Sequence, residues 1–207
     1  MSVLASPLPS SATLPAISPP EPVWRLTLDQ YHAMIEHGIL TSDTPVELLD
    51  GLLVPKMSKN PPHTLATRLM REALEGVLPP GWYVTSQEPI TLQQSEPEPD
   101  VSLIRGTPRD YATRHPGPAD LGLVVEVADS SLPRDRKWKQ VVYSQDGIVE
   151  YWLLDLVNRT LEVFTTPRIG TRLGYTTSQT YEPTDRVPVN LDGSVVGHIL
   201  VDNVLPS

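Results

Sequence analysis

A short stretch of almost continuous apolar sequence, Leu-Val-Val-Glu-Val at residues 123–127, most constrains how this chain can fold. It lacks the alternation of a half-exposed strand, so it predicts a central strand buried on both faces of a sheet. Glu126 interrupts the stretch, and an unpaired charge in such a strand would be costly. We therefore expect Glu126 to meet a cation, a metal ion or a proton. The alternative is a Glu at the sheet edge that pairs with an Arg.

The rest of the sequence predicts a mixed α/β domain with one central sheet. The capping-box pattern of Thr27 and Gln30 predicts a short helix that ends at Gly38. Asp50-Gly51 between two apolar runs predicts a hairpin with a two-residue turn. We expect further helices over 63–78 and 134–144, and further strands over 82–86, 90–92, 101–104, 121–127, 151–155, 161–164 and 195–201.

Composition narrows the class of protein. The chain has 207 residues and no cysteine, which excludes disulfide scaffolds, Cys-ligated zinc and thiol catalysis. No apolar run approaches the roughly 20 residues of a membrane helix, so we expect no membrane contact and a cytoplasmic protein. The net charge of −9 argues against a protein that coats nucleic acid nonspecifically, but it leaves a local basic site open.

Proline is concentrated at the start of the chain. Six of the 23 prolines fall within residues 1–23, where Glu21 is the only charged residue. This composition predicts a flexible, partly polyproline tail. We expect residues 24–207 to form a single domain.

A second carboxylate stands where it could meet Glu126. Asp100 comes directly before the expected strand 101–104, so the two acids could face each other across the sheet. Facing carboxylates repel unless a divalent cation lies between them. Oxygen ligands in a chain without cysteine suit Mg²⁺ or Mn²⁺.

A basic run, Arg-Asp-Arg-Lys-Trp-Lys at residues 134–139, carries a local charge of +3 in this acidic chain. The ordinary interpretation of such a run is a solvated helix start. Basic residues in a first turn oppose the helix dipole, however, so a phosphate-facing role is the alternative hypothesis.

Several motifs, taken together, resemble one family. The pattern Glu-Leu-Leu-Asp-Gly at 47–51 is similar to a family hairpin, and 99–101 and 124–127 match its two metal-binding strands. The spacing of Asp135, Lys139 and Tyr143 matches its helix motif, and residues 147–155 are close to its "EYWlvD" strand. Over about residues 25–165 the chain resembles the Uma-two family of restriction endonucleases, within the PD-(D/E)XK nuclease superfamily.

The resemblance implies a restriction-endonuclease-like fold, with a mixed central β-sheet flanked by helices, and a Mg²⁺-dependent (or Mn²⁺-dependent) endonuclease that hydrolyses DNA. Asp100, Glu126 and the main-chain carbonyl of Val127 would ligate the metal ion. Lys139 would be the family's migrated lysine, which orients water or neutralises the transition state, and Glu47 an accessory acid. Contact with DNA would be local and metal-dependent, and a homodimer is expected because such folds often dimerise to cut two strands.

Two other functions compete with this hypothesis. Ala128 stands where the superfamily usually has its lysine, which, with the charge of −9, favours a catalytically silent DNA-binding or protein-interaction module of the same fold. A glycosidase pair of Asp100 and Glu126 would need a cleft lined with exposed aromatic rings. We expect the aromatic residues at 138–152 to pack in the core, His63 to begin a helix or support the site, and Glu96 and Glu98 to lie in an exposed loop.

Overall fold

The computed structural model describes residues 23–57, 59–129, 135–168 and 173–207. Apart from Val23, the predicted N-terminal tail lies outside the described residues. Among those described, no helix is long and apolar enough to cross a membrane.

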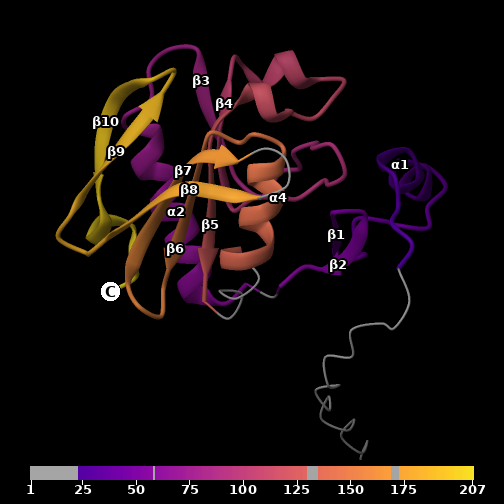
Figure 1. Cartoon of the computed structure of the whole chain (residues 1–207), viewed down its shortest axis with the longest axis horizontal. Coiled ribbons are helices and arrows are strands. Elements are labelled where there is room, and N and C mark those ends of the chain that lie inside the picture. The colour runs from indigo at the N-terminus through magenta and orange to yellow at the C-terminus, as the bar shows by residue number, and fades with distance from the viewer. Residues whose placement is uncertain (1–22, 58, 130–134, 169–172) are drawn as a thin grey trace, which may run out of the picture.

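Helices and strands follow one another along the whole described chain (Figure 1). In chain order they are α1 (Leu28–Glu36), β1 (Val46–Leu49), β2 (Leu52–Pro55), α2 (Pro61–Glu75), β3 (Trp82–Thr85), β4 (Val101–Arg105), the 3-10 turns η1 (Pro108–Tyr111) and η2 (Pro118–Asp120), β5 (Leu121–Ala128), the π-helical turn η3 (Asp135–Lys139), α4 (Gln140–Gln145), β6 (Glu150–Asp155), β7 (Thr160–Arg168), β8 (Gly174–Tyr181), β9 (Arg186–Leu191), β10 (Ser194–Leu200) and the 3-10 turn η4 (Val201–Val204).

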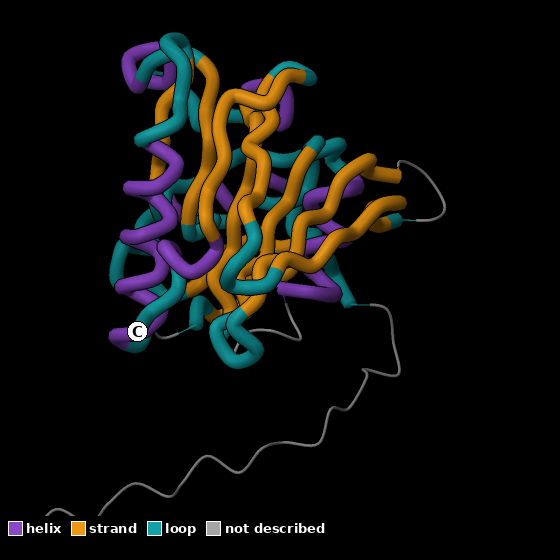
Figure 2. Tube along the Cα trace, turned by 90° about the vertical axis from the view of Figure 1, so that its left-hand side faces the viewer, coloured by secondary structure: helices purple, strands orange, loops and turns teal. Residues whose placement is uncertain are grey.

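The central sheet has six strands in the order β3-β4-β5-β6-β7-β8. Figure 2 shows strands of the molecule lying side by side, with helices beside them. Strands β5 and β6 run parallel, and every other neighbouring pair in this sheet is antiparallel. A parallel pair needs a crossover connection, and here η3 and α4 lie on it. The predicted mixed α/β class, with a mixed central sheet and flanking helices, is confirmed.

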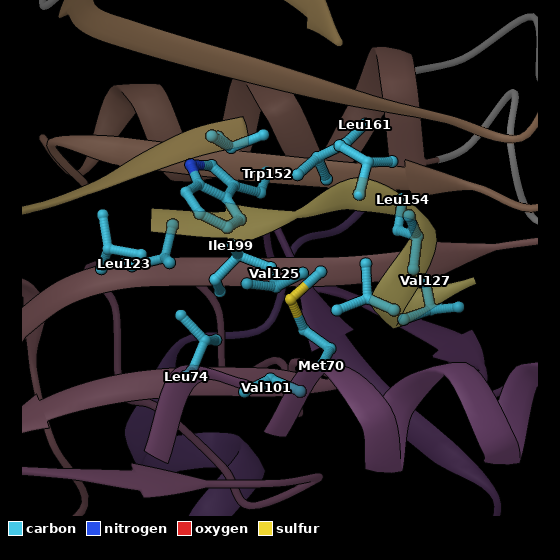
Figure 3. Close-up of a cluster of buried hydrophobic side chains, with 14 of the residues drawn as sticks. Met70, Leu74, Val101, Leu123, Val125, Val127, Trp152, Leu154, Leu161 and Ile199 are labelled. Carbon is cyan, nitrogen blue, oxygen red and sulfur yellow. The ribbon is translucent and has the colours of Figure 1, made fainter. Parts of the chain in front are cut away.

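Side chains of β5 alternate between two apolar layers. Val125 and its neighbours on that face pack against α2, β9 and β10 (Figure 3), whereas Val124 and Ala128 pack against α4. All eight residues of β5 are buried, as the apolar run predicted. Glu126 shares the α4 face of the sheet with Val124 and Ala128, because alternate residues of a strand point the same way.

The predicted capping box and hairpin are both present. Thr27 and Gln30 exchange side-chain-to-backbone hydrogen bonds of 3.2 and 3.0 Å at the start of α1. Asp50 and Gly51 have φ values of +49° and +73°, as a type I′ turn between β1 and β2 requires. The hairpin places Glu47 on β1 toward the rest of the molecule, where it is buried.

Helix boundaries differ from the sequence expectation at both ends of α2, which ends at Glu75 rather than at residue 78, and in the helix expected over 134–144. α2 begins at Pro61 rather than at residue 63, because prolines fit the first helical positions and Asn60 supplies the N-cap. The helix expected over 134–144 is a π-helical turn followed by α4, and Arg134 lies outside the described residues.

Two expectations for residues 90–98 are wrong. Residues 90–92 form no strand: the backbone N–H groups of Ile90 and Leu92 bond to Pro97 and Ser95 in a compact turn. Glu96 is not in an exposed loop, because it is 5% exposed and accepts hydrogen bonds from His32 and Thr91. Glu98 is half-buried beside Lys56. Tertiary partners, which local sequence does not reveal, account for both errors.

We predict that Met70→Ala lowers the free energy of unfolding by about 2–5 kcal/mol, because Met70 is fully buried between α2 and the sheet. Met57→Ala is the matched control, since Met57 is 44% exposed and its loss is expected to cost under about 0.5 kcal/mol. Urea unfolding of both variants checks this. Equal losses would contradict the assignment of Met70 to the core.

Candidate active site

Asp100 and Glu126 lie opposite each other at one end of the sheet. Val101 pairs with Val125 in the antiparallel β4–β5 ladder, and continuing this register by one residue places Asp100 opposite Glu126. The carboxylate of Asp100 then reaches across to β5, where the backbone N–H of Val127 donates to its Oδ2 over 2.9 Å. The predicted meeting of the two acids across the sheet is therefore seen in the structure.

Glu126 is 3% exposed and is held from the crossover between β5 and β6. The Nζ of Lys139 lies 2.8 Å from Glu126 Oε1, and the hydroxyl of Tyr143 donates to the same oxygen over 2.6 Å. Lys139 ends the π-helical turn and Tyr143 lies one turn later in α4, so both side chains point to the sheet from one side. Glu126 thus has a lysine partner inside the sheet, not an arginine partner at its edge.

Asp100 is fixed by groups from several elements. His63, on the first turn of α2, places Nε2 3.1 Å from Asp100 Oδ2, and Gln87 donates to Oδ1 over 3.4 Å. Burial by itself would raise the pKa of Asp100, but the contacts from His63 and the Val127 N–H outweigh it and lower the pKa below its usual range. Asp100 is therefore held as a carboxylate. His63 supports the site, as expected for a residue at a helix start.

Glu47 completes the buried group from the β1–β2 hairpin. It is 3% exposed, and its Oε1 lies 3.6 Å from Lys139 Nζ. The backbone N–H of Glu98 donates to its other oxygen over 3.4 Å. Lys139 is consequently shared between Glu126 and Glu47.

Electrostatic conditions differ sharply among these groups. Burial raises the pKa of Glu126 to about 8; Lys139 opposes this shift, whereas the nearby Asp100, Asp135 and Glu47 add to it. Burial would lower the pKa of Lys139, but the surrounding carboxylates raise it, so Lys139 stays an ammonium. Both donors to Glu126 approach Oε1, which leaves Oε2 as the atom for a proton or another cation.

All of the predicted site residues line one cavity of about 60 Å³, which has room for an ion and a few waters. Among the described residues its lining consists of Glu47, Lys56, Met57, Lys59, Asn60, His63, Glu98, Asp100, Glu126, Val127, Asp129, Asp135 and Lys139. Six carboxylates against three lysines give a formal charge of −3 with His63 neutral. This excess of hard oxygen donors fits a divalent cation such as Mg²⁺.

Of the six carboxylates, Asp100 and Glu126 are the two that are expected from the sequence to hold a metal ion. In the ranges that the structure describes, no group of three or more His, Asp or Glu side chains is arranged to hold a metal ion. The ligand set that the resemblance implies, Asp100, Glu126 and the main-chain carbonyl of Val127, has only two such side chains. Val127, whose peptide adjoins both acids, lines the cavity.

Comparison with known proteins shows which family this chain belongs to. The family model for Uma2, described as "Putative restriction endonuclease", matches residues 28–193. The chain belongs to the Uma2 family. The matched span contains every site residue predicted from the sequence. Among curated proteins, none matches this chain.

A solved structure shares the fold of this Uma2 family member. The crystal structure of a "putative nuclease belonging to DUF820" from Anabaena variabilis superposes with a TM-score of 0.66 at 16% sequence identity. The match covers 86% of this chain and 97% of that chain. The restriction-endonuclease-like core expected from the sequence is thus supported by family and by fold.

The described part of the basic run, residues 135–139, does not form one outward-facing cluster of cations. Arg136 pairs with Asp155 and Glu162, and Lys139 is buried, whereas Lys137 is exposed. Among its described basic residues, Lys139 and Arg136 are thus paired with acids of the protein, and Lys137 faces solvent. Arg134 lies outside the described residues.

From the sequence, Tyr143 belongs to the family's helix motif and its ring is expected to pack in the core, with no role at the site. The side chain is indeed fully buried, but its hydroxyl holds Glu126. The four-residue spacing from Lys139 to Tyr143 carried the signal, since residues four apart lie on one face of a helix. Trp152 and Tyr151 are buried in the core, as predicted.

We predict that Lys139→Met lowers the free energy of unfolding by about 3 kcal/mol, because it leaves buried carboxylates without their cation. In the double variant Lys139→Met/Glu126→Gln part of this loss is recovered, which gives a coupling energy of about 1 kcal/mol or more in urea unfolding. Lys137→Met, at an exposed position of the same turn, is the control and changes little. Additive effects of the two substitutions would contradict the ion pair.

Proposed function

We propose that this Uma2 family member is a Mg²⁺- or Mn²⁺-dependent endonuclease that hydrolyses phosphodiester bonds in DNA. The observation that carries the proposal is the convergence of Asp100, Glu126 and Lys139, from three separate segments, on one cavity of negative charge. The family description and the nuclease name of the structural neighbour point to the same chemistry.

Asp100, Glu126 and the main-chain carbonyl of Val127 would hold the metal ion. When bound, the ion would supply an activated water and stabilise the charge that develops on the phosphate. The chain's own part is to keep the two acids in position. His63 and the Val127 N–H hold Asp100 ionised, and Tyr143 holds Glu126 Oε1.

Lys139 would orient the attacking water or neutralise the phosphate. Lys139 is 3% exposed, and a buried charge acts more strongly on a reacting group than one in bulk water. Glu47 shares the ammonium with Glu126 and would act as an accessory acid that sets its position.

A second candidate is a catalytically silent DNA-binding or protein-interaction module. One observation favours it: Lys139 and Tyr143 already engage Glu126 Oε1, so the site is electrostatically satisfied in part by the protein itself. In that case the carboxylates would stabilise the fold and bind no metal ion. The predicted homodimer stays a prediction under either function.

We predict that the purified protein cleaves plasmid DNA with Mg²⁺ or Mn²⁺ and that chelation by EDTA abolishes cleavage. Asp100→Asn and Lys139→Met are each expected to lower the rate by about 100-fold or more. Asp43→Asn, an exposed acid outside the cavity, is the matched control and should cleave at the wild-type rate. Intact plasmid with both metals, in a folded wild-type sample, would count against the nuclease.

Calorimetry with Mn²⁺ separates the two candidate functions. For a nuclease we expect a binding isotherm for the wild type that Asp100→Asn abolishes and Asp43→Asn leaves unchanged, because Asp100 contributes oxygen ligands. The silent module predicts no heat of binding from any of the three proteins.

A further inference from the structure

Among the described residues that line the candidate active site, two lysines that reach the surface lie on the connection between β2 and α2. The chain has only four lysines, and three of them line the cavity: Lys56, Lys59 and Lys139. Lys139 is buried and shared by two carboxylates, so its ammonium is committed to the floor of the site. Lys56 and Lys59 are the lysines left at the rim.

Neither rim lysine is strongly engaged. Lys59 is exposed, and its ammonium makes no ion pair with another described residue. Lys56 Nζ lies 2.6 Å from Glu98 Oε1, but both side chains are about one-third exposed, and a pair of this kind exchanges easily for another anion. Both lysines can therefore turn to a phosphate without leaving a buried charge unpaired.

The same connection leads into the start of α2. Asn60 caps this 15-residue helix, and both Asn60 and His63 line the cavity, so the positive end of the helix dipole is at the rim. No acidic residue lies in the first turn of α2 to offset that charge. On this side two lysines and the helix N-terminus stand against two acids, Glu98 beside Lys56 and Asp129, which accepts a hydrogen bond from the Asn60 side chain. The floor, by contrast, holds Glu47, Asp100 and Glu126 around one lysine.

A DNA strand that binds here needs cations at the rim as well as a metal ion at the floor of the cavity. Its phosphates would be repelled by the six carboxylates of the cavity, and a metal ion at Asp100 and Glu126 serves only the phosphate that reacts. In a chain of net charge −9, the phosphates on either side need a local cation. We propose that Lys56 and Lys59 bind the DNA backbone phosphates that flank the reacting one, so that the strand crosses the connection between β2 and α2. This inference rests on the proposed nuclease function.

The test measures binding of a fluorescently labelled DNA duplex by anisotropy, with Ca²⁺ in place of Mg²⁺ to hold the complex, over a series of salt concentrations. Lys59→Ala and Lys56→Ala are each expected to weaken binding several-fold and to reduce the slope of log K against log salt by about 0.9. In the double variant Lys56→Ala/Lys59→Ala, the slope of log K against log salt should fall by about 1.8, twice the reduction in each single variant. Lys59→Arg should retain both affinity and slope.

Lys137→Ala is the matched control, because Lys137 is an exposed lysine outside the cavity; it should keep the wild-type slope. In cleavage with Mg²⁺, the rim variants should raise KM with little change in kcat, whereas Asp100→Asn lowers kcat. If the wild type cleaves DNA but both rim variants keep its affinity, salt slope and KM, the inference is overturned and the nuclease stands. If the wild type neither binds nor cleaves DNA, both are overturned.

Discussion

The buried contact between Glu126 and Lys139 is the interaction on which the rest of this structure depends. Glu126 lies in a strand whose eight residues are all buried, so its desolvation must be offset by a partner. Lys139 provides that partner from the crossover between the only two parallel strands of the central sheet. Three features of the fold bring groups to this pair. The crossover carries Lys139, the register of β4 against β5 places Asp100 opposite Glu126, and the β1–β2 hairpin brings Glu47 to Lys139.

Much of the fold followed from local patterns in the sequence. The continuous apolar run around Glu126 predicted a central strand, and the Asp50-Gly51 turn predicted the hairpin that carries Glu47. These predictions succeeded because each pattern reports a property of nearby residues alone: burial on both faces, or a turn with positive φ. The meeting of Asp100 with Glu126 could also be predicted, since both acids belong to the ends of neighbouring strands.

The remaining errors concern charged groups whose partners are distant in sequence. Glu96 was expected to be exposed because its neighbours are polar and proline-rich, but His32, 64 residues earlier, bonds to it. The basic run that contains Arg136 is predicted to be a solvated helix start or, alternatively, to face a phosphate, whereas in the structure acids of β6 and β7 pair with Arg136. Local composition predicts how many charges a segment has; only the packing of the sheet decides which of them remain available to solvent.

Ala128 occupies the position where the superfamily usually has its lysine, and here the lysine lies on the crossover instead. This placement limits where chain length can change within the family. Ala128 is fully buried against Val142 and Tyr143, so β5 can end in tight apolar packing without having to carry an ammonium. The number of residues between Lys139 and Tyr143 on the crossover is fixed instead, because both side chains must reach Glu126. Each residue inserted between η3 and α4 would turn the following side chains by about 100° about the helix axis, taking Tyr143 away from the oxygen that Lys139 holds. We therefore expect natural relatives to tolerate changes in length beyond α4 far better than within residues 139–143.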